Sequence, residues 1–407
     1  MTRIGFLFNH DHVHQIPHAA PVGFELSSLS ASVEVVFITS SQPQLEYLKS
    51  LEADYPQHKC IFTRISIPAW LSYIGDFLDK ALPFTRVGML ASNLEIFKNL
   101  DVLVVPEKTS LLLRSLFGIK NLKFVYTAHG AGDREIGFNK KIAKFDLIFL
   151  SGPKIKIRMQ QAGLLKTAAS SIIGYPKFDA FQVFSKTRPR LFDNEKPVVL
   201  YNPHFSPTLS SWFKMGEDIL HYFYHCDKYN LIFAPHVMLF KRKAHIAPRK
   251  LSFGWTRSIA RQYQDCPHML IDTGSNACTD MTYTLASDIY LGDVSSQIWE
   301  FLVRPGHCLF ANSHNVDWRD DPNYLHWHTG PVFNNIEKLQ ESLELAVSTH
   351  ASYQAKQVEL FRYTFDINDQ SSSKRAARAV LQFIDKAIAV KNHIGTVDKI
   401  SASSNTL

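Results

Sequence analysis

The stretch that decides the fold is SDIYLGDVSSQIWEF, residues 287–301. It opens with an apolar run that has the length and composition of a buried strand. It closes with Ile298 and Phe301, which lie at helical spacing and share one face. Between the two parts lies a group of small hydrogen-bonding residues. A buried strand that turns directly into a helix is the repeating unit of an α/β sheet, and ligands bind beside the carboxyl ends of such strands.

Similar units recur along the chain on both sides of this stretch. Continuous apolar runs alternate with segments of helical spacing, and such runs are typical of strands buried on both faces of a parallel sheet. The pattern therefore predicts an α/β fold with two Rossmann-like, doubly wound domains and an interdomain cleft. The runs begin at Arg3, Glu34, Lys59, Asp101, Lys123, Phe145, Ser170, Pro197, Asn230, His268, Asp288 and His307.

The breaks in this pattern predict the domain organisation. A chain of 407 residues is too long for one comfortable hydrophobic core. Residues 185–196, SKTRPRLFDNEK, are polar and lack periodicity, which favours an interdomain linker. We therefore predict an N-terminal Rossmann-like domain over residues 1–184 and a C-terminal Rossmann-like domain over residues 197–370. A C-terminal helix is expected over residues 371–392 and a flexible tail over residues 393–407.

The composition is that of a globular protein, with 45% hydrophobic and 20% charged residues. Five scattered cysteines form no C-x-x-C pair, so neither a disulfide framework nor a thiolate zinc site is indicated. The N-terminal residues turn polar too early for a signal peptide, and no run has the apolar length of a membrane span. We therefore expect a protein of the reducing cytoplasm.

The formal net charge of +7 favours anionic partners, such as nucleotides, phosphorylated substrates, nucleic acid or an acidic membrane surface. Nucleic acid binding would require a cluster of basic and aromatic residues, and no convincing cluster of that kind is evident, so we expect no nucleic acid partner. Residues 111–123, LLLRSLFGIKNLK, are one candidate for docking to an anionic membrane surface, although a core helix explains the same pattern.

His129 and Gly130 follow an apolar strand directly, in the segment YTAHGAGDREIGFN of residues 126–139. A histidine at a strand end suits a general base, because its ordinary pKa lies near working pH. A glycine there lets the backbone approach a ligand closely. A turn histidine whose ring is satisfied by the backbone explains the same residues equally well.

The turn between the predicted strand and the predicted helix of residues 287–301 suits an anion. If a helix starts near Asp293, its first N–H groups lack partners and its dipole presents partial positive charge. The hydroxyls of Ser295 and Ser296 add neutral donors. Asp293 itself is expected to cap the helix or to orient a serine, and Glu300 could reach a ribose hydroxyl. Helix capping alone explains Asp293 but not the paired serines, so we favour a phosphate-binding joint.

Two further strand ends carry candidate residues. His236 closes the apolar run LIFAPHVML, residues 231–239, and we predict that it faces the same cleft as His129. Lys177 lies in IIGYPKFDAF, residues 172–181. We interpret this second segment first as a strand-turn-helix joint, with contact between Lys177 and an anion as the alternative.

Several motifs are absent from the sequence. It contains no G-x-x-x-x-G-K-[ST] phosphate loop, no G-x-G-x-x-G after the first strand and no G-x-S-x-G nucleophile elbow. It also lacks the spacing of clustered metal ligands. The sequence therefore implies no cofactor and no protein-held divalent metal.

Taken in order, these pieces resemble the CDP-glycerol glycerophosphotransferase family, whose members build polymers of the teichoic-acid type. The resemblance runs from about Lys123 to Val390, and the first hundred or so residues match nothing specific. The segments that carry it are His129–Gly130, Gly174–Asp179, Tyr201–Pro203, His236, residues 287–301 and residues 366–380, DINDQSSSKRAARAV.

The resemblance implies a GT-B architecture, in which the N-terminal domain lies on the acceptor side and the C-terminal domain binds a nucleotide-activated donor. By similarity, Ser295 and Ser296 would hold the phosphates of the donor. His129 would be the base for the acceptor hydroxyl, and His236 would stabilise charge on the phosphates.

Three departures concern the transferred group and the acceptor side. The family commonly follows its HG pair with a threonine-proline and a lysine, where this chain has Ala131–Arg134. The family usually has histidine before proline in the second-domain strand, where this chain has Pro235 before His236. An aromatic residue and an arginine often follow the second-domain tyrosine-proline, where this chain has His204–Phe205. A nucleotide sugar or another CDP-alditol would suit the same scaffold.

These observations predict a transferase of cell-envelope polymer synthesis. It would move a glycerophosphate or glycosyl group from a nucleotide-diphosphate donor, such as CDP-glycerol or a nucleotide sugar, to a hydroxyl of a lipid-linked or glycan acceptor. We expect it to be cytoplasmic or peripheral on the inner face of the cell membrane. Two alternatives remain open: an enzyme like the UDP-sugar 2-epimerases, and a non-catalytic relative that binds an envelope precursor.

Overall fold

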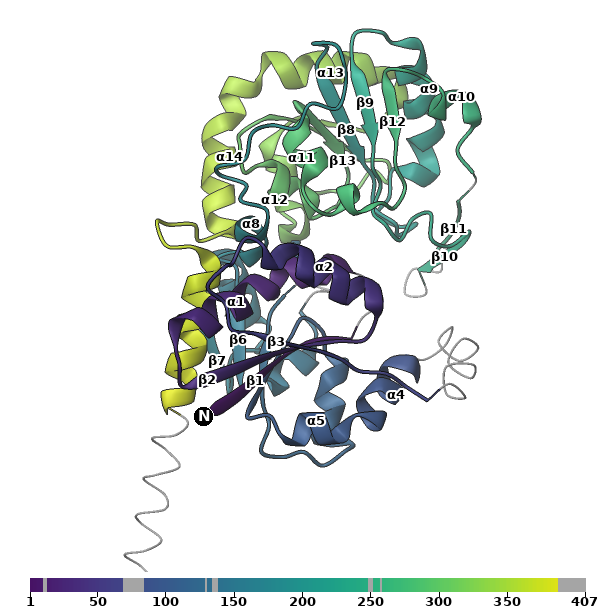
Figure 1. Ribbon diagram of the computed structural model, residues 1–407. Coiled ribbons are helices and arrows are strands. Elements are labelled where there is room, and N and C mark those ends of the chain that lie inside the picture. Colours follow the sequence, from purple (N-terminus) through teal and green to yellow (C-terminus); the bar gives the residue numbers. More distant parts are fainter. Residues whose placement is uncertain are drawn as a thin grey trace, which may run out of the picture. The chain divides into compact units, whose positions relative to one another are not determined.

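The computed structural model describes residues 1–9, 13–68, 84–128, 130–133, 138–247, 252–256 and 258–386. The chain forms two compact units (Figure 1). Unit 1 consists of Met1–His129, Lys140–Ala180 and Phe365–Leu407, and unit 2 consists of Gly130–Asn139 and Phe181–Thr364. Residues 185–196 form neither helix nor strand, and their role as an interdomain linker stays a prediction.

Unit 1 is built on a parallel sheet of seven strands in the order β3-β2-β1-β4-β5-β6-β7. The first six positions follow the strand order of a dinucleotide-binding Rossmann sheet. The strands are β1 (Thr2–Phe8), β2 (Val33–Thr39), β3 (Ile61–Arg64), β4 (Val102–Val105), β5 (Lys123–Tyr126), β6 (Leu147–Leu150) and β7 (Ala169–Ile172). The helices are α1 (Ala20–Leu29), α2 (Gln42–Glu52), α4 (Phe84–Ser92), α5 (Leu94–Lys98), α6 (Leu112–Ser115), α7 (Pro153–Gln161) and α8 (Pro176–Ala180).

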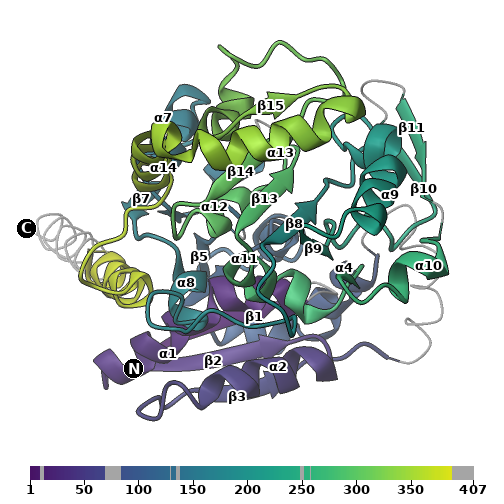
Figure 2. The ribbon, with the colours of Figure 1, turned by 90° about the horizontal axis from the view of Figure 1, so that it is seen from above.

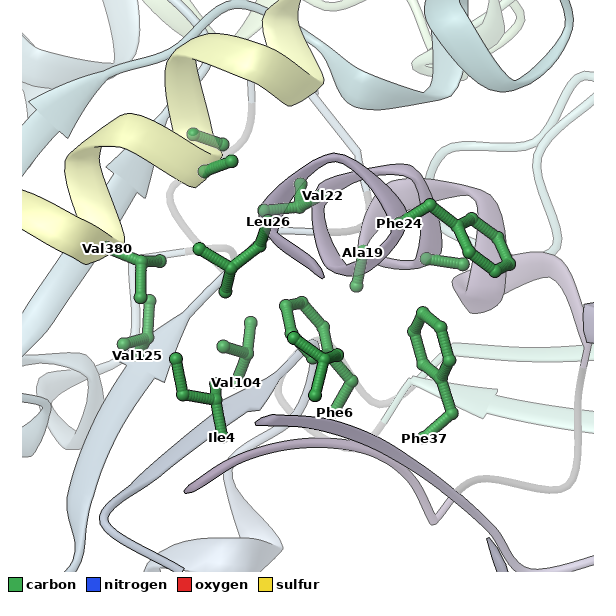
Figure 3. Packing of buried hydrophobic residues seen from close by; sticks show 14 of the residues in the cluster. Ile4, Phe6, Ala19, Val22, Phe24, Leu26, Phe37, Val104, Val125 and Val380 are labelled. Carbon is green, nitrogen blue, oxygen red and sulfur yellow. The ribbon is translucent and has the colours of Figure 1, made fainter. Parts of the chain in front are cut away.

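The core of unit 1 lies on one face of this sheet and is closed by the C-terminal part of the chain. Ile4 and Phe6 alternate with residues of the opposite face and pack against Val22 and Phe24 of α1 (Figure 3). Val380, from the helix of residues 372–386, lies in the same cluster. Since each fully buried side chain of this kind contributes about 1.5–3 kcal/mol, the last helix is part of the unit-1 core rather than an appendage.

The segment that contains Lys177 docks this last helix. Gly174 has a left-handed backbone conformation, with φ of +82°. The next residue, Tyr175, donates its backbone N–H to the Ser372 hydroxyl over 2.8 Å. The Asp179 carboxylate accepts from the backbone N–H and the hydroxyl of Ser373, each over 2.6 Å, and so caps the helix start. The segments Gly174–Asp179 and 366–380, both of which carry the family resemblance, therefore contact each other although they lie nearly 200 residues apart in sequence.

Unit 2 contains a parallel sheet of six strands in the order β12-β9-β8-β13-β14-β15. The strands are β8 (Val198–Asn202), β9 (Asn230–Phe233), β12 (Met269–Ile271), β13 (Ile289–Gly292), β14 (His307–Ala311) and β15 (Val332–Phe333). An antiparallel hairpin of β10 (Ala244–Ala247) and β11 (Ser252–Trp255) is inserted between β9 and β12. The helices are α9 (Glu217–His225), α10 (Arg261–Gln264), α11 (Thr282–Ala286), α12 (Gln297–Phe301), α13 (Leu339–Ser348) and α14 (His350–Thr364).

Helices cover both faces of the unit-2 sheet (Figure 2). On one face, Leu291 of β13 packs with Phe223 of α9 and Leu343 of α13 in a single buried cluster. On the other face, the Tyr290 ring lies 5.6 Å from the Phe301 ring of α12. Both units are therefore doubly wound α/β sheets, and the predicted fold of two Rossmann-like domains is confirmed.

The docking of the last helix leads to a stability prediction for Gly174→Ala. A Cβ at this position would lie 2.3 Å from the Ser372 Oγ and 2.9 Å from the carbonyl oxygen of Asp366. The left-handed conformation alone costs an alanine about 1–2 kcal/mol, and overpacking adds a cost of similar size. We expect Gly174→Ala to lower the free energy of unfolding of unit 1 by about 3 kcal/mol, measured by thermal unfolding with circular dichroism.

Gly118→Ala is the matched control, because Gly118 has a φ of +72° and no heavy atom within 4 Å of the added Cβ. It should show the conformational cost without the clash. Equal losses in the two variants would contradict the docking role of Gly174.

Candidate functional site

The topology of unit 2 makes the carboxyl ends of β8 and β13 the expected position of a ligand. These two neighbouring strands stand where the strand order reverses, so their connections leave on opposite sides of the sheet. Gly292 pairs with Asn202 at the carboxyl ends of the two strands. Open α/β sheets bind ligands outside the carboxyl ends at this switch point. Residues 287–301 therefore meet the residues that follow β8 at the position where a ligand is expected.

The Asp293 carboxylate joins the two strand ends. It accepts the backbone N–H of His204 over 2.9 Å, the backbone N–H of Ser211 over 2.7 Å and the Ser211 hydroxyl over 2.9 Å. The backbone N–H of Val294 also donates to it over 2.6 Å. The side chain is buried, with 1% of its surface exposed. Burial raises the pKa of Asp293, and the hydrogen bonds from Ser211, Val294 and His204 oppose that shift.

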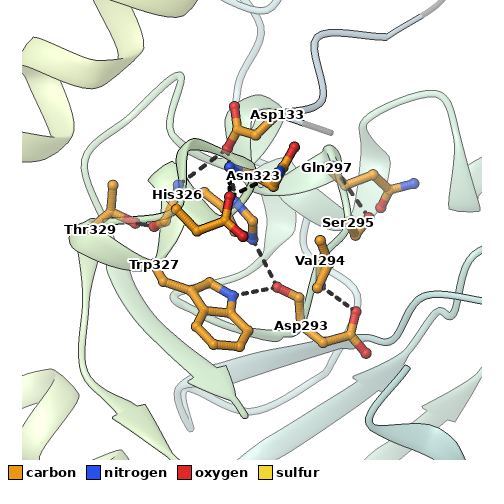
Figure 4. Close-up of polar contacts among 10 residues, drawn as sticks. Asp133, Asp293, Val294, Ser295, Gln297, Asn323, His326, Trp327 and Thr329 are labelled. Carbon is orange, nitrogen blue, oxygen red and sulfur yellow. Dashed lines mark hydrogen bonds and ion pairs between the residues drawn. The ribbon is translucent and has the colours of Figure 1, made fainter. Parts of the chain in front are cut away.

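The Asp293 backbone carbonyl holds a second group of residues (Figure 4). It accepts from the indole Nε1–H of Trp327 over 2.7 Å and pairs with the Nε2 of His326 over 2.9 Å. Both residues belong to the short helix η8 (Pro322–Thr329). The other ring nitrogen of His326, Nδ1, lies 2.8 Å from the Asp133 carboxylate. The chain thus connects Asp133 to the end of β13 through a single imidazole ring.

The two ring nitrogens of His326 face two oxygen groups, the Asp133 carboxylate and the Asp293 carbonyl. A protonated imidazole satisfies both with one N–H each, because a carboxylate and a carbonyl oxygen accept hydrogen bonds. The side chains of His326 and Asp133 expose 3% and 0% of their surface, so this is a buried ion pair. The backbone N–H of His326 donates to the same carboxylate over 3.2 Å. Removal of one partner would leave the other charge buried without compensation.

This ion pair holds the glycine-rich loop of residues 130–133 against Ser295 and Ser296. We call these two residues, at the turn between β13 and α12, the serine joint. A Cβ added to Gly130 would lie 3.8 Å from the Ser296 Oγ, and one added to Gly132 would lie 3.6 Å from the Ser296 Cβ. The loop backbone and Ser296 are therefore near neighbours within unit 2. The short side chains leave the backbone accessible to a close ligand on this side.

The helix after the serines starts later than the sequence suggests. Its first residue is Gln297 and its N-cap is Ser296, so the expected start near Asp293 is wrong. The reason is that the Asp293 carboxylate is occupied by the segment after β8 and caps no helix. The Ser295 hydroxyl accepts the backbone N–H of Gln297 over 3.3 Å. Within the described ranges, no hydrogen bond of the Ser296 hydroxyl is present.

Two histidines lie at the neighbouring strand ends. His204 follows β8 and His236 follows β9, and their ring centroids are 5.5 Å apart, with Phe205 beside both. The Nδ1 of His204 accepts the backbone N–H of Ser206 over 2.9 Å, and the Nδ1 of His236 accepts that of Met238 over 3.2 Å. A neutral ring with Nδ1 as acceptor carries its proton on Nε2. Each ring is therefore a hydrogen-bond donor through Nε2, which suits a phosphate oxygen.

The structure locates most of the predicted site residues, while their roles stay predictions. Lys177 belongs to unit 1, where it is 4% exposed within α8. Glu300 lies in α12 and is 6% exposed. His129 lies outside the described residues. The predicted residues that belong to unit 2 are Gly130, His236, Asp293, Ser295, Ser296 and Glu300.

Three further residues of unit 2 escaped the sequence analysis. His326 and Asp133 show no local pattern, since their contact spans 193 residues. Asp272 directly follows β12 and accepts from the Tyr283 hydroxyl over 2.6 Å. Burial opposes ionisation of Asp272, but hydrogen bonds from Ser275, Tyr283 and Gly274 outweigh it and lower its pKa to about 2. Its position after an apolar strand was a signal that could have found it.

In the part of the chain that the structure describes, no group of three or more His, Cys, Asp or Glu side chains could hold a metal ion. None of the helices formed by the described residues combines the length and the apolar character that crossing a membrane requires.

Solved structures of two kinds of enzyme are similar in fold. The wall teichoic acid polymerase TagF aligns with a TM-score of 0.57 at 14% identity, over 96% of this chain and 90% of that chain. A putative UDP-N-acetylglucosamine 2-epimerase from Listeria monocytogenes aligns with a TM-score of 0.59 at 13% identity, over 95% and 96%. The UDP-GlcNAc 2-epimerase from Methanocaldococcus jannaschii aligns with a TM-score of 0.57 at 11% identity, over 94% and 99%.

No protein-family model and no curated protein matches the sequence. At identities this low, structural similarity establishes the fold alone. The chain therefore has a fold of the GT-B type, and membership of the CDP-glycerol glycerophosphotransferase family stays a prediction.

The buried ion pair leads to a prediction for unit 2. We expect Asp133→Ala or His326→Ala to lower its free energy of unfolding by about 3–5 kcal/mol, because each leaves an unpaired buried charge. The double variant should cost less than the sum of the two. Urea unfolding followed by tryptophan fluorescence reports on this unit, since every tryptophan except Trp70 lies in it.

Glu359→Ala is the matched control, because Glu359 pairs with Lys356 at the surface of unit 2, where the side chains are 63% and 46% exposed. Its loss should change stability little. Small and additive effects of Asp133→Ala and His326→Ala would contradict the assignment of a buried charged pair.

Proposed function

We propose that this chain is an enzyme that binds a nucleotide diphosphate at the carboxyl ends of β8, β9 and β13 in unit 2. The single observation that carries the proposal is the composition of this switch point. The serine joint, the glycine-rich loop of residues 130–133 and two Nε2–H imidazoles lie within one unit, around strand ends that Asp293 fixes. Neutral N–H and O–H donors in a fixed arrangement favour a diphosphate electrostatically.

The proposed reaction is transfer of a glycerophosphate or glycosyl group from the nucleotide donor to an acceptor hydroxyl. The acceptor oxygen forms the new bond, the bond between the transferred group and the nucleotide breaks, and the nucleotide leaves with the electron pair. Ser295, Ser296 and His236 would stabilise the charge on the departing phosphates. His129 would accept the proton of the acceptor hydroxyl, an expectation that rests on the sequence alone. Gly130, Lys177, Asp293 and Glu300 remain proposed donor-side residues.

A 2-epimerase is the competing proposal, and the fold favours it equally, because epimerases and TagF align with similar scores. One of the TagF structures is described as soaked with CDPG, whereas the epimerases are named for UDP-N-acetylglucosamine. The nucleotide preference of this chain therefore separates the two directions. A non-catalytic relative that binds an envelope precursor is the third possibility.

The nucleotide site predicts a ligand-dependent thermal shift. We expect CDP or UDP to raise the unfolding midpoint of the wild-type protein selectively over ADP and GDP. A ligand at about 100 times its Kd stabilises the native state by about 2.7 kcal/mol, which is several degrees in midpoint. Ser295→Ala/Ser296→Ala should abolish the shift, because it removes both hydroxyl donors of the joint.

Ser348→Ala/Ser352→Ala is the matched control, since both serines are exposed at the ends of α13 and α14. It should keep the wild-type shift. An undiminished shift in the Ser295/Ser296 variant would reject the serine joint as the phosphate site. No shift with any nucleotide would reject the nucleotide-binding proposal.

Product analysis then decides between the two reactions. UDP-N-acetylglucosamine incubated alone would yield its epimer if the chain is an epimerase. CDP-glycerol or a nucleotide sugar would release free nucleotide only with an acceptor if the chain is a transferase. His129→Ala should abolish transfer while nucleotide binding persists, and full activity in that variant would exclude His129 as the base.

A further inference from the structure

The hairpin of β10 and β11 carries an exposed aromatic pair. Phe253 and Trp255 expose 60% and 56% of their surface, and their ring centroids lie 6.2 Å apart. Gly254 between them is buried, as the alternation of side chains along a strand requires. Both rings therefore lie on the same outward face of the hairpin. Two large aromatic side chains side by side on a surface mark an interaction site more often than a single exposed one does.

The inner face of the hairpin is fixed to unit 2. A Cβ added to Gly254 would lie 2.5 Å from the Phe213 ring, so the backbone rests directly on that ring. The His245 ring pairs through Nε2 with the carbonyl oxygen of Leu239 over 2.7 Å. The Thr256 hydroxyl donates to the same carbonyl oxygen over 3.1 Å. The aromatic pair is thus held on a packed platform, and its exposure is part of the folded structure.

Basic residues stand beside the aromatic pair. Lys241, Arg242 and Lys243 are exposed and directly precede β10. Antiparallel pairing sets Ala244 opposite Trp255, which brings this basic run next to the aromatic end of β11. The sequence from residue 240 to residue 261 contains no Asp or Glu. Its basic residues are Lys241, Arg242, Lys243, Arg249, Lys250, Arg257 and Arg261.

This cluster revises the sequence analysis, in which no convincing basic and aromatic cluster was evident. Ten or more residues separate residues 241–243 from the aromatic pair along the chain, and the hairpin register brings them together. Arg249, Lys250 and Arg257 flank the pair in the sequence itself and were a signal that could have found the cluster. Residues 111–123, the earlier candidate for membrane docking, expose Leu116 but bury Leu111 and Leu113. A core role accounts for that segment better than docking does.

We propose that the hairpin docks the protein onto an anionic phospholipid bilayer. Indole and phenyl rings insert at the boundary between headgroups and acyl chains, while lysine and arginine side chains contact anionic headgroups. The outward face of the hairpin carries the phenyl ring of Phe253 and the indole of Trp255, and basic residues lie beside them. Residues 240–261 contain no Asp or Glu. An anionic bilayer fits this combination of aromatic and basic side chains. The hairpin leaves the sheet just after His236, at the same carboxyl edge as the serine joint, so docking brings that edge to the lipid surface.

The proposal is independent of the nucleotide site and is tested with the full chain and phospholipid vesicles. We expect co-sedimentation with vesicles of phosphatidylcholine and phosphatidylglycerol, weakened by salt, and none with phosphatidylcholine alone. Phe253→Thr/Trp255→Thr should weaken binding about tenfold or more. Arg242→Gln/Lys243→Gln should weaken it about 25-fold, because each basic residue near an anionic surface contributes about fivefold.

Leu116→Thr/Lys120→Gln is the matched control, since both residues are exposed in the competing segment. It should bind vesicles as the wild type does. Unchanged unfolding midpoints and nucleotide shifts in all three variants would show that the fold and the nucleotide site are intact.

Three outcomes would overturn the proposal. The wild-type protein could stay in the supernatant with both kinds of vesicle. The Leu116/Lys120 variant could lose binding while the hairpin variants keep it. Finally, the protein could bind a single-stranded oligonucleotide through Phe253 and Trp255 but bind no vesicles, which would assign the hairpin to nucleic acid.

Discussion

A carboxylate that is withdrawn from water has to find donors for both of its oxygens, and Asp293 finds them in the segment after β8. This requirement fixes residues 204–211 to the end of β13. The backbone carbonyl of the same residue binds Trp327 and His326, and His326 in turn binds Asp133. Asp293 and His326 therefore connect four segments that are distant in sequence. The positions of Ser296 and of the loop at residues 130–133 both depend on them.

This network shows why a phosphate would bind beside Asp293 and not to it. Its carboxylate would repel a diphosphate, yet its oxygens accept hydrogen bonds from N–H and O–H groups of the protein, and the residue is 1% exposed. The neutral donors near it are the hydroxyls of Ser295 and Ser296 and the Nε2–H groups of His204 and His236. Preorganised neutral donors stabilise an anion without the cost of moving when charge develops.

The elements that depend on local pattern were predictable from sequence. Continuous apolar runs identified the parallel strands of both sheets except the two-residue β15, because a strand buried on two faces has no polar alternation. Contacts across long separations were not. Asp293 followed by Ser295 and Ser296 has the local pattern of a helix cap, and only the packing of residues 204–211 shows that its carboxylate is used elsewhere. Similarly, the contacts of Gly174 and Asp179 with the last helix have no local trace.

The fold by itself allows more than one chemistry, since sites are built on scaffolds that many functions share. Two features of this chain bear on what the scaffold does: the Asp133–His326 pair and the hairpin of β10 and β11. The first sets the loop beside the serines, and the second presents aromatic and basic side chains from the same sheet edge. Together they support the proposals of a nucleotide site and of a neighbouring surface that docks to an anionic bilayer.

Hydrogen exchange followed by mass spectrometry, with and without CDP or UDP, tests the central claim most directly. The account predicts that the nucleotide slows exchange in three segments of unit 2, residues 203–206, 236–239 and 293–297, which border the carboxyl ends of β8, β9 and β13. Slower exchange confined to other segments, with these three unchanged under saturating nucleotide, would contradict it.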